Sequence, residues 1–257
     1  MMADGIEPDV VSYGIMIHAH RKVNKYDEAI EMLNEMERKK IKVTPHVYCM
    51  LINGLGSEKK LDEAVKYFEL YKGNGFAVEV FTYNAMVGAY CCCMRMDDAY
   101  RLVDEMRRRK IGPNTRTYDV ILHHLIKGRR TNGAYSVLQK MSNDPGCEPT
   151  ISTYEIMKRT FCNEDRIDMA LRVWDQMKAK GVLPGMHSFS TLIKSFCHED
   201  RLEDACKYYE EMLDMGMRPP IQLFDNLKRE LLDLGKEDII KALWRKLEKL
   251  RKSPLVG

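Results

Sequence analysis

Residues 80–114 read VFTYNAMVGAYCCCMRMDDAYRLVDEMRRRKIGPN, and this stretch decides the fold. Its first half places apolar side chains at Tyr83, Met86, Val87 and Tyr90. Because residues three or four positions apart share one face of a helix, this spacing predicts an amphipathic helix. Such a helix needs a partner that covers its apolar face, and the second half of the stretch supplies one.

A second helix is predicted where the apolar spacing starts again, from residue 96 to residue 106 and on into the basic run that follows. Acidic residues 97–98 stand in its first turn and the basic run 107–110 follows in its last, as the helix dipole favours. Pro113 ends the pattern because proline cannot continue a helix interior. Thr82 is the expected N-cap of the first helix. The stretch as a whole predicts a helical hairpin.

The aromatic residue that opens this hairpin recurs every 35 residues, with one extra residue after the fourth copy. Its copies are Tyr13, Tyr48, Tyr83, Tyr118, Tyr154, Phe189 and Phe224. An alanine of the second helix keeps the same spacing and the same slip, at Ala29, Ala64, Ala99, Ala134, Ala170 and Ala205. Two series that share one spacing indicate a true internal repeat, and repeats of this length stack. We expect both series to be buried packing positions.

The repeat predicts an all-α solenoid of helix-turn-helix repeats in one elongated domain. The expected repeats span residues 10–44, 45–79, 80–114, 115–150, 151–185 and 186–220, and a partial repeat with a C-terminal capping helix spans 221–257. The extra residue of the fourth repeat falls in the turn at 142–146, whose composition tolerates an insertion. Residues 1–9 match the end of a repeat, so we expect a fragment that begins inside a truncated upstream repeat.

The 257 residues are 45% hydrophobic and 31% charged, with a formal net charge of +3. We find no apolar run long enough to cross a membrane and no signal peptide, so no membrane partner is expected. A large exposed helical surface needs many charges to stay soluble. The near balance of these charges does not by itself favour a nucleic-acid partner.

Cysteine and histidine are present, but they are not spaced as metal ligands. Structural zinc favours Cys-x-x-Cys pairs, and none occurs in the chain. The first cysteine of the run 91–93 shares one repeat position with Cys162 and Cys197, so packing is the favoured interpretation. His123 and His124 point about 100° apart on a helix and cannot share a metal. A glycine-rich phosphate loop is also absent. We expect no metal, no cofactor and no enzymatic activity.

The order of residues within the repeat resembles the pentatricopeptide repeat. The resemblance rests on Thr82-Tyr83-Asn84 with Asp97-Asp98-Ala99 and Asp104-Glu105-Met106, and on Val11-Ser12-Tyr13 with Asp27-Glu28-Ala29 and Asn34-Glu35-Met36. The related tetratricopeptide repeat has a period of about 34 residues and another residue order. The resemblance covers nearly the whole chain. The constant repeat length is similar to that of the plain P subclass, and the overall sequence is similar to land-plant mitochondrial members.

The resemblance implies a right-handed superhelix whose first helices line a groove for single-stranded RNA, with about one base read per repeat. It also implies that the residue after the recurring aromatic and the last residue of the repeat form a base-reading pair. The implied pairs are Gly14 with Thr44, Cys49 with Glu79, Asn84 with Asn114, Asp119 with Thr150, Glu155 with Gly185, and Ser190 with Pro220.

Most of these pairs depart from the pattern of the family. Asn84 with Asn114 is the one standard pair, and it implies a pyrimidine. The glycines and proline of other pairs lack a side chain for a base edge. Glu79, Asp119 and Glu155 would place negative charge in the groove, where it repels phosphate.

Two further positions of the family are kept in part. The second residue of a repeat, an apolar wedge between bases, is kept at Val11 and Phe81, and the phosphate-facing lysine is kept at Lys22 and Lys127. The equivalents of that lysine without a fixed positive charge are Ser57, Cys92, Asn163 and His198. Because phosphate neutralisation supplies much of the affinity for RNA, we predict weak or non-specific RNA binding.

Two functions stay open. The first is a non-catalytic RNA-binding protein of an organelle, by resemblance the mitochondrion or else a plastid, that acts in RNA processing, stability or translation. The second is a helical scaffold for protein or ribonucleoprotein assembly with little base-specific reading. Its monomeric or homodimeric state also stays open. The basic run 107–110 is favoured as a solvated helix cap, and a contact with the RNA backbone is the alternative.

Overall fold

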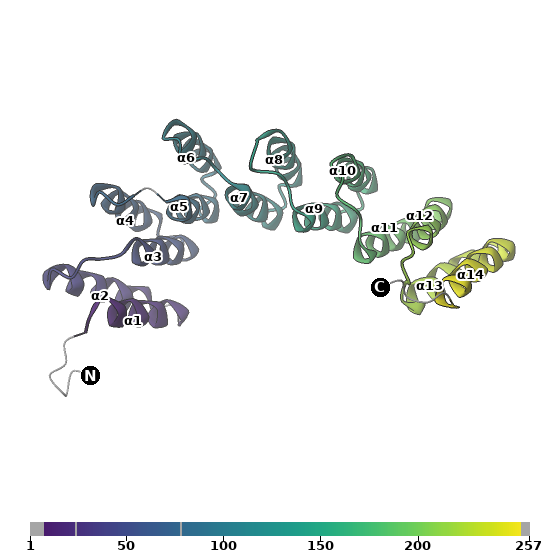
Figure 1. The fold of residues 1–257 in the computed structure, drawn as a ribbon, viewed down its shortest axis with the longest axis horizontal. Coiled ribbons are helices and arrows are strands. Elements are labelled where there is room, and N and C mark those ends of the chain that lie inside the picture. Colours follow the sequence, from purple (N-terminus) through teal and green to yellow (C-terminus); the bar gives the residue numbers. More distant parts are fainter. Residues whose placement is uncertain (1–7, 24, 78, 253–257) are drawn as a thin grey trace. The chain divides into compact units, whose positions relative to one another are not determined.

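The computed structural model describes residues 8–23, 25–77 and 79–252, which form fourteen α-helices and no strand (Figure 1). The helices are α1 (Val10–Lys22), α2 (Tyr26–Arg38), α3 (Pro45–Ser57), α4 (Leu61–Gly73), α5 (Val80–Cys92), α6 (Met96–Arg108), α7 (Thr115–Lys127), α8 (Thr131–Asn143), α9 (Ile151–Asn163), α10 (Ile167–Ala179), α11 (Met186–His198), α12 (Leu202–Asp214), α13 (Ile221–Asp233) and α14 (Glu237–Lys252). The predicted all-α class is confirmed. Residues 1–7 of the expected truncated repeat lie outside the described residues.

The helices alternate as the first and second members of hairpins. First helices begin at residues 10, 45, 80, 115, 151, 186 and 221, where the sequence places the starts of the repeats. A residue in the left-handed region turns the chain inside a hairpin, as at Met94 between α5 and α6, with a φ of 60°. Across that turn Arg95 N–H donates to Tyr90 O at 2.9 Å, which satisfies a carbonyl at the end of the helix.

The hairpin of α5 and α6 corrects one expectation. Thr82 is not the N-cap of the first helix, because α5 already begins at Val80 and the threonine is its third residue. Glu79 occupies the cap position, with an extended backbone and no side-chain hydrogen bond to the helix. In α6 the acidic residues lie in the first turn as predicted, and the helix ends at Arg108.

The core is built from the recurring positions. The recurring aromatic residues are at most 3% exposed, and the recurring alanines are fully buried. Rings from neighbouring hairpins meet edge to face, as Phe68 of α4 and Tyr83 of α5 do at a centroid distance of 5.0 Å. Trp174 and Phe189 repeat this contact between α10 and α11 at 4.8 Å. The predicted burial of both series is therefore confirmed, and it explains how one hairpin stacks on the next.

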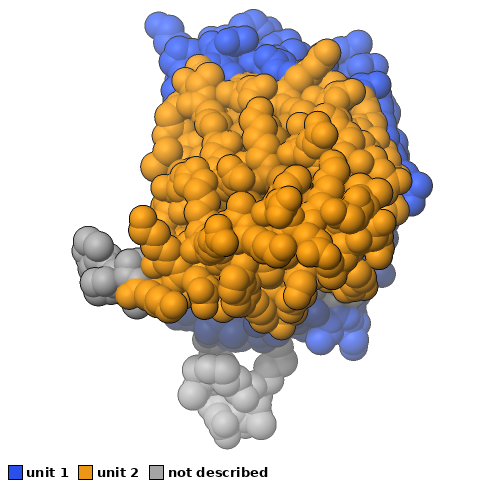
Figure 2. Space-filling view, turned by 90° about the vertical axis from the view of Figure 1, so that its right-hand side faces the viewer, with its two compact units in different colours: residues 1–148 blue, residues 149–257 orange. Residues whose placement is uncertain are grey.

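The chain divides into two compact units, residues 1–148 and 149–257, which are coloured separately in Figure 2. In the first unit α1, α3, α5 and α7 contact one another in order, and α2 and α4 also pack against the first helix that follows. In the second unit α9, α11 and α13 contact one another in the same order. First helices thus form a layer within each unit. None of the helices in the described ranges is both long and apolar enough to span a membrane.

Candidate nucleic-acid interface

The second residue of each repeat lies at the start of a first helix and is exposed. The two predicted apolar wedges, Val11 and Phe81, are 66% and 42% exposed. Polar residues are exposed at the same position in the other repeats, at His46, Arg116, Ser152, His187 and Gln222. Burial of a large apolar side chain is worth about 1.5–3 kcal/mol. Val11 and Phe81 each leave a large part of their surface outside that burial, and this exposed part is available to a ligand.

A groove of 420 Å³ lies between α1 and α3 in the first unit. Its lining includes the second residues of two consecutive repeats, Val11 and His46, and the implied reading pair Gly14 and Thr44. A side-chain carbon added to Gly14 would meet no atom within 4 Å, so this part of the groove is open. The structure therefore places the implied reading pair Gly14 and Thr44 beside the second residues of two consecutive repeats.

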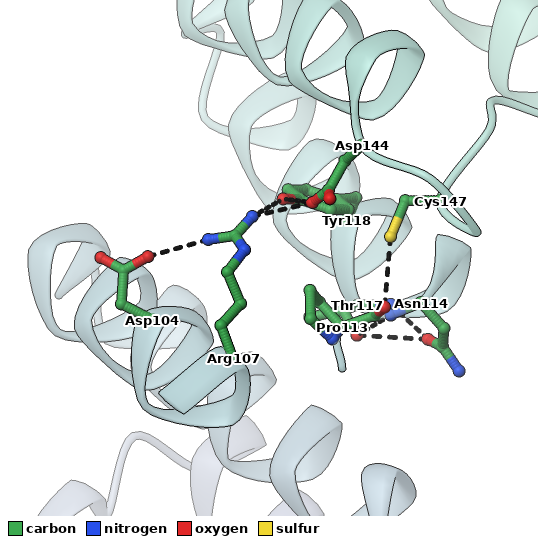
Figure 3. A network of polar contacts seen from close by, with 8 residues as sticks. All are labelled: Asp104, Arg107, Pro113, Asn114, Thr117, Tyr118, Asp144 and Cys147. Carbon is green, nitrogen blue, oxygen red and sulfur yellow. Dashed lines mark hydrogen bonds and ion pairs between the residues drawn. The ribbon is translucent and has the colours of Figure 1, made fainter. Parts of the chain in front are cut away.

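The standard pair Asn84 and Asn114 is in direct contact within a small polar network. Asn84 Nδ2 donates to Asn114 Oδ1 at 3.4 Å. Thr117 of the following repeat holds both residues: its hydroxyl donates to Asn84 Oδ1 at 2.7 Å, and its N–H donates to Asn114 Oδ1 at 3.1 Å. Figure 3 shows Asn114 and Thr117 at the start of α7, where Asn114 is the N-cap.

This network fixes the direction of the Asn84 amide. An amide side chain offers two donor hydrogens and two acceptor sites. One acceptor site of Asn84 is used by Thr117 and one hydrogen by Asn114, so one site of each kind is left for a base edge. Asn84 is only 9% exposed, which limits how much of it a base can reach.

Glu155, the implied reading residue of the fifth repeat, corrects the expectation of a repulsive charge. Its carboxylate accepts a hydrogen bond from the Ser188 hydroxyl and lies 3.2 Å from Lys158 Nζ. Lys158 is 1% exposed, and its burial lowers the pKa of the ammonium group although Glu155 acts in the opposite direction. The negative charge is therefore balanced inside the protein.

Ser188 and Thr117 occupy the same position in their repeats, and each reaches back to the residue after the recurring aromatic of the preceding repeat. Thr82 stands at this position too, and its buried hydroxyl has no hydrogen-bond partner among the described residues. In both links the acceptor is an oxygen, on Asn84 or Glu155, whereas the corresponding residue of the repeat before Thr82 is Cys49.

The other implied reading residues have mixed surroundings. Cys49 Sγ lies 3.8 Å from the carbonyl oxygen of Phe81, and Thr150 caps α9 by accepting from Thr153 N–H at 3.2 Å. Gly185 and Pro220 are exposed N-cap residues without a side-chain hydrogen bond to α11 and α13. Half-buried side chains stand at Thr44, Glu79, Asp119 and Ser190.

The thirteenth residue of the repeat, the implied phosphate contact, is charged at Lys22 and Lys127, which are both exposed. Ser57 is turned to its own helix, where its hydroxyl donates to Asn53 O at 2.9 Å. Cys92 Sγ lies 3.1 Å from His124 Nε2 on α7. Burial raises the pKa of Cys92, so the thiol stays protonated and adds no negative charge at neutral pH.

The basic run at the end of α6 divides into an engaged and an exposed part. Arg107 Nη1 lies 2.8 Å from Asp104, and Nη2 lies 2.8 Å from Asp144 of the next hairpin and also contacts the Tyr118 hydroxyl (Figure 3). The guanidinium holds the pKa of Asp144 below its ordinary value. Arg108 and Lys110 are exposed. Arg107 lies in the last turn of α6 with 42% of its side chain exposed, as the favoured interpretation of a solvated cap requires, and it also joins the third and fourth repeats.

Possible metal ligands are scattered over the described part of the chain. No group of three or more His, Cys, Asp and Glu side chains there lies close enough to hold an ion. Cys91 and Cys162 are buried, and burial raises the pKa of Cys91 to about 12. They pack as small apolar residues.

Two features of this face were not predicted. The Asn114-x-x-Thr117 and Thr150-x-x-Thr153 capping boxes carry a readable sequence signal, since a short polar residue three positions before another is typical of a helix start. The second feature is a row of exposed cations at the ninth residue of the last three repeats. The 35-residue spacing of these cations is the signal that could have revealed the row in the sequence.

Comparison with protein families gives matches over most of the chain. The PPR repeat family model matches residues 8–57, 78–127, 113–163 and 159–198, and the PPR repeat model matches residues 46–76 and 187–217. A mitochondrial pentatricopeptide repeat-containing protein of Arabidopsis thaliana is 50% identical over 145 residues, which cover 56% of this chain and 28% of that protein. Another mitochondrial member from this plant is 30% identical over 183 residues, which cover 71% of this chain and 31% of that protein.

Solved structures agree with this result at the level of the fold. Maize PPR10 in complex with an 18-nucleotide psaJ RNA element has a TM-score of 0.65 at 18% identity, covering 95% of this chain and 42% of that chain. The PPR domain of Arabidopsis thaliana protein-only RNase P 1 in complex with tRNA has a TM-score of 0.53 at 17% identity, covering 70% and 94%. The chain spans well under half the length of the curated relatives quoted above. It belongs to the pentatricopeptide repeat family.

Proposed function

We propose that this chain is the RNA-binding part of a non-catalytic protein that acts in RNA processing, stability or translation inside an organelle. The observation that carries the proposal is the groove between α1 and α3, where Val11, His46, Gly14 and Thr44 converge on one open space. Exposed wedge positions continue along the first helices of both units. Stacking on such side chains and contact with backbone phosphates are the usual means of holding single-stranded RNA.

The relatives support an organelle as the site of action. Two that match this chain at 50% and 30% identity are mitochondrial, and one at 26% identity over 183 residues is chloroplastic. We therefore assign the mitochondrion as the first choice and the plastid as the second.

The non-catalytic assignment rests on the part of the protein-only RNase P structures that this chain resembles. The protein-only RNase P 1 structure that resembles this chain is its PPR domain. In protein-only RNase P 2 the match covers 41% of that chain. The described residues also offer no metal cluster that could activate water.

The proposal is tested by binding the 257-residue chain to a pool of random single-stranded RNA and sequencing the bound fraction. The test variant is Asn84→Ser/Asn114→Ser, because serine still caps α7 while it removes both amides. The control is Asn132→Ser/Asn143→Ser, which changes the same residue type at exposed sites of α8. We expect the native chain and the control to enrich the same sequences, and the test variant to lose selectivity at one nucleotide.

One outcome would reject the RNA-binding assignment, and another would reject only the reading pair. If the native chain binds none of the pool even at low salt, a helical scaffold for protein or ribonucleoprotein assembly becomes the better function. If the test variant enriches the same sequences as the control, RNA is bound but the Asn84 and Asn114 pair does not read it.

A further inference from the structure

We infer that Arg159, Lys194 and Arg229 form a second phosphate-binding row, one helical turn before the position at which the family resemblance places phosphate contacts. The row belongs to the second unit, and its ligand is the backbone of single-stranded RNA. This inference rests on the proposed RNA-binding function and adds which residues hold the backbone there.

The three cations occupy one position in three consecutive repeats. Arg159 lies on α9, Lys194 on α11 and Arg229 on α13, each at the ninth residue of its repeat, and all three are exposed. Helix α11 contacts both α9 and α13. Packed helices have axes about 8–10 Å apart, so the row advances by one cation per helix. One cation per repeat matches a ligand that is bound one nucleotide per repeat.

The family position is empty of fixed positive charge in this unit. The thirteenth residues of these repeats are Asn163, His198 and Asp233. Residues four apart lie on the same face of a helix, and a rise of about 1.5 Å per residue places them roughly 6 Å apart along it. The ninth residue thus presents its charge on the same face, nearer to the reading position.

These charges are not neutralised within the protein. None of the three cations lies within ion-pair distance of a carboxylate in residues 149–252, and Arg229 Nη2 donates to the neutral Asn226 Oδ1 at 3.1 Å. Three other cations of the second unit are paired at short distance, Lys178 with Glu211, Arg201 with Asp204 and Lys246 with Asp214. Exposed and unpaired positive charge in a row is suited to an anionic polymer.

A groove gives two of the cations a common target. A space of 490 Å³ between α11 and α13 is lined by Lys194 and Arg229, with His198 and Asn226 beside them. Asp200 and Glu230 also line it, outside ion-pair distance of both cations. Lysine binds phosphate as a point charge, and arginine binds it through a planar fork of donors. A phosphate in this groove would meet both.

The first unit lacks this row. Its ninth residues are His18, Asn53, Gly88 and His123, and its fixed charges at the thirteenth residue are Lys22 and Lys127. The two units therefore use different positions of the same helical repeat to present positive charge. Loss of the family lysine in the second unit is accompanied by a gain of charge one turn earlier.

The test measures how the affinity of the full chain for a fluorescently labelled oligouridine depends on salt concentration. The row variant is Arg159→Gln/Lys194→Gln/Arg229→Gln. The control variant, Arg172→Gln/Lys207→Gln/Arg245→Gln, removes the same charge from exposed sites on the second helices α10, α12 and α14. Each phosphate contact adds about 0.7 to the slope of log affinity against log salt for a single strand. We expect the slope of the row variant to be smaller in magnitude than the native slope by about 2, and the slope of the control variant to equal the native slope.

Thermal unfolding of both variants should match the native chain, since all six side chains are exposed. Equal slopes in the two variants would overturn the phosphate row while RNA binding itself stands. If the native chain fails to bind the oligouridine at low salt, the proposed function fails and the row fails with it.

Discussion

Lys158 Nζ lies 3.2 Å from Glu155 Oε2 in an ion pair whose lysine side chain is 1% exposed and whose glutamate is 19% exposed. The ammonium group also lies 5.5 Å from the centroid of the Trp174 ring, an arrangement that stabilises a cation. The pair lies on α9 within one turn of helix. It turns a carboxylate on the candidate RNA-binding face into a nearly neutral group.

Breaking this pair is expected to destabilise the protein. Lys158→Met leaves Glu155 without its counter-charge, and we expect a loss of about 1–3 kcal/mol, less than for a fully buried pair because Glu155 is partly exposed. The double variant Glu155→Gln/Lys158→Met removes both charges and should recover most of the loss. Urea unfolding at neutral pH measures both values. A single variant as stable as the native chain would contradict the role of the pair.

The same lysine predicts a pH dependence. Its pKa is lowered from 10.5 mainly by burial, so the unfolded chain binds more protons than the folded chain between the lowered pKa and 10.5. Stability from this residue therefore rises as the pH rises through that window. The stability of the native chain relative to Lys158→Met should increase as the pH is raised toward 10.5. A constant difference over this range would show that the lysine is not desolvated.

Two threonines at one repeat position are expected to respond in opposite directions. Thr117→Val removes the donor to Asn84 and leaves a buried acceptor unpaired, so a loss of about 1–3 kcal/mol is expected. Thr82 is fully buried and its hydroxyl has no partner among the described residues, so Thr82→Val should keep or raise stability. Thermal unfolding followed by circular dichroism compares them, and losses of equal size would refute the difference.

Two helical glycines lie in different surroundings, one closely packed against a neighbouring helix and the other open. A side-chain carbon on Gly56 of α3 would lie 2.6 Å from the Cα and Cβ atoms of Ala89 on α5, so Gly56→Ala should cost about 1–3 kcal/mol through overpacking. Gly14→Ala meets no atom within 4 Å and should gain about 0.5–1 kcal/mol from helix propensity. Chemical denaturation of the two variants checks the sign of each change, and a stabilising Gly56→Ala would mean that the helices can separate freely.

The Arg107 network is expected to couple two hairpins. A double-mutant cycle with Arg107→Ala and Asp144→Ala should give a coupling of about 0.5–1 kcal/mol, since both groups are partly exposed. The exposed pair Lys241 and Glu237 within α14 is the control and should couple less. Asp144 has a lowered pKa, so its contribution is present above 3.8 and is lost as the pH falls through its folded pKa. A coupling that persists unchanged in acid would exclude the carboxylate as its source.

The fold could be predicted because its information is periodic. Tyr83 and Ala99 are buried as expected, since a residue that recurs at the repeat length must face a neighbouring repeat. The turn residues were less predictable. Met94 adopts the left-handed region with φ of 60°, although its side chain gives no local preference for that conformation. Stacking of the hairpins overrides the local preference there.

The candidate site was predictable in position but not in its contacts. The first helix and the wedge residues Val11 and Phe81 follow from the repeat register. The surroundings of Glu155 do not, because Lys158 lies against Trp174 of α10 and Ser188 of α11 bonds to Glu155 only after these helices have packed. A charge in the sequence therefore indicates electrostatics only after its burial and its partners are known. Arg107 of the basic run is a second example, because its ion pair with Asp144 is known only from the structure.

The hydroxyl links from Thr117 to Asn84 and from Ser188 to Glu155 have a consequence for how such repeats can be exchanged. A repeat transplanted by recombination or by protein engineering would bring its own side chain after the recurring aromatic, but would leave behind the hydroxyl that orients it. It would also impose its own hydroxyl on the repeat before it. Repeats of this protein therefore cannot be exchanged independently. The smallest unit that can be transferred with its contacts intact is the junction of two consecutive repeats.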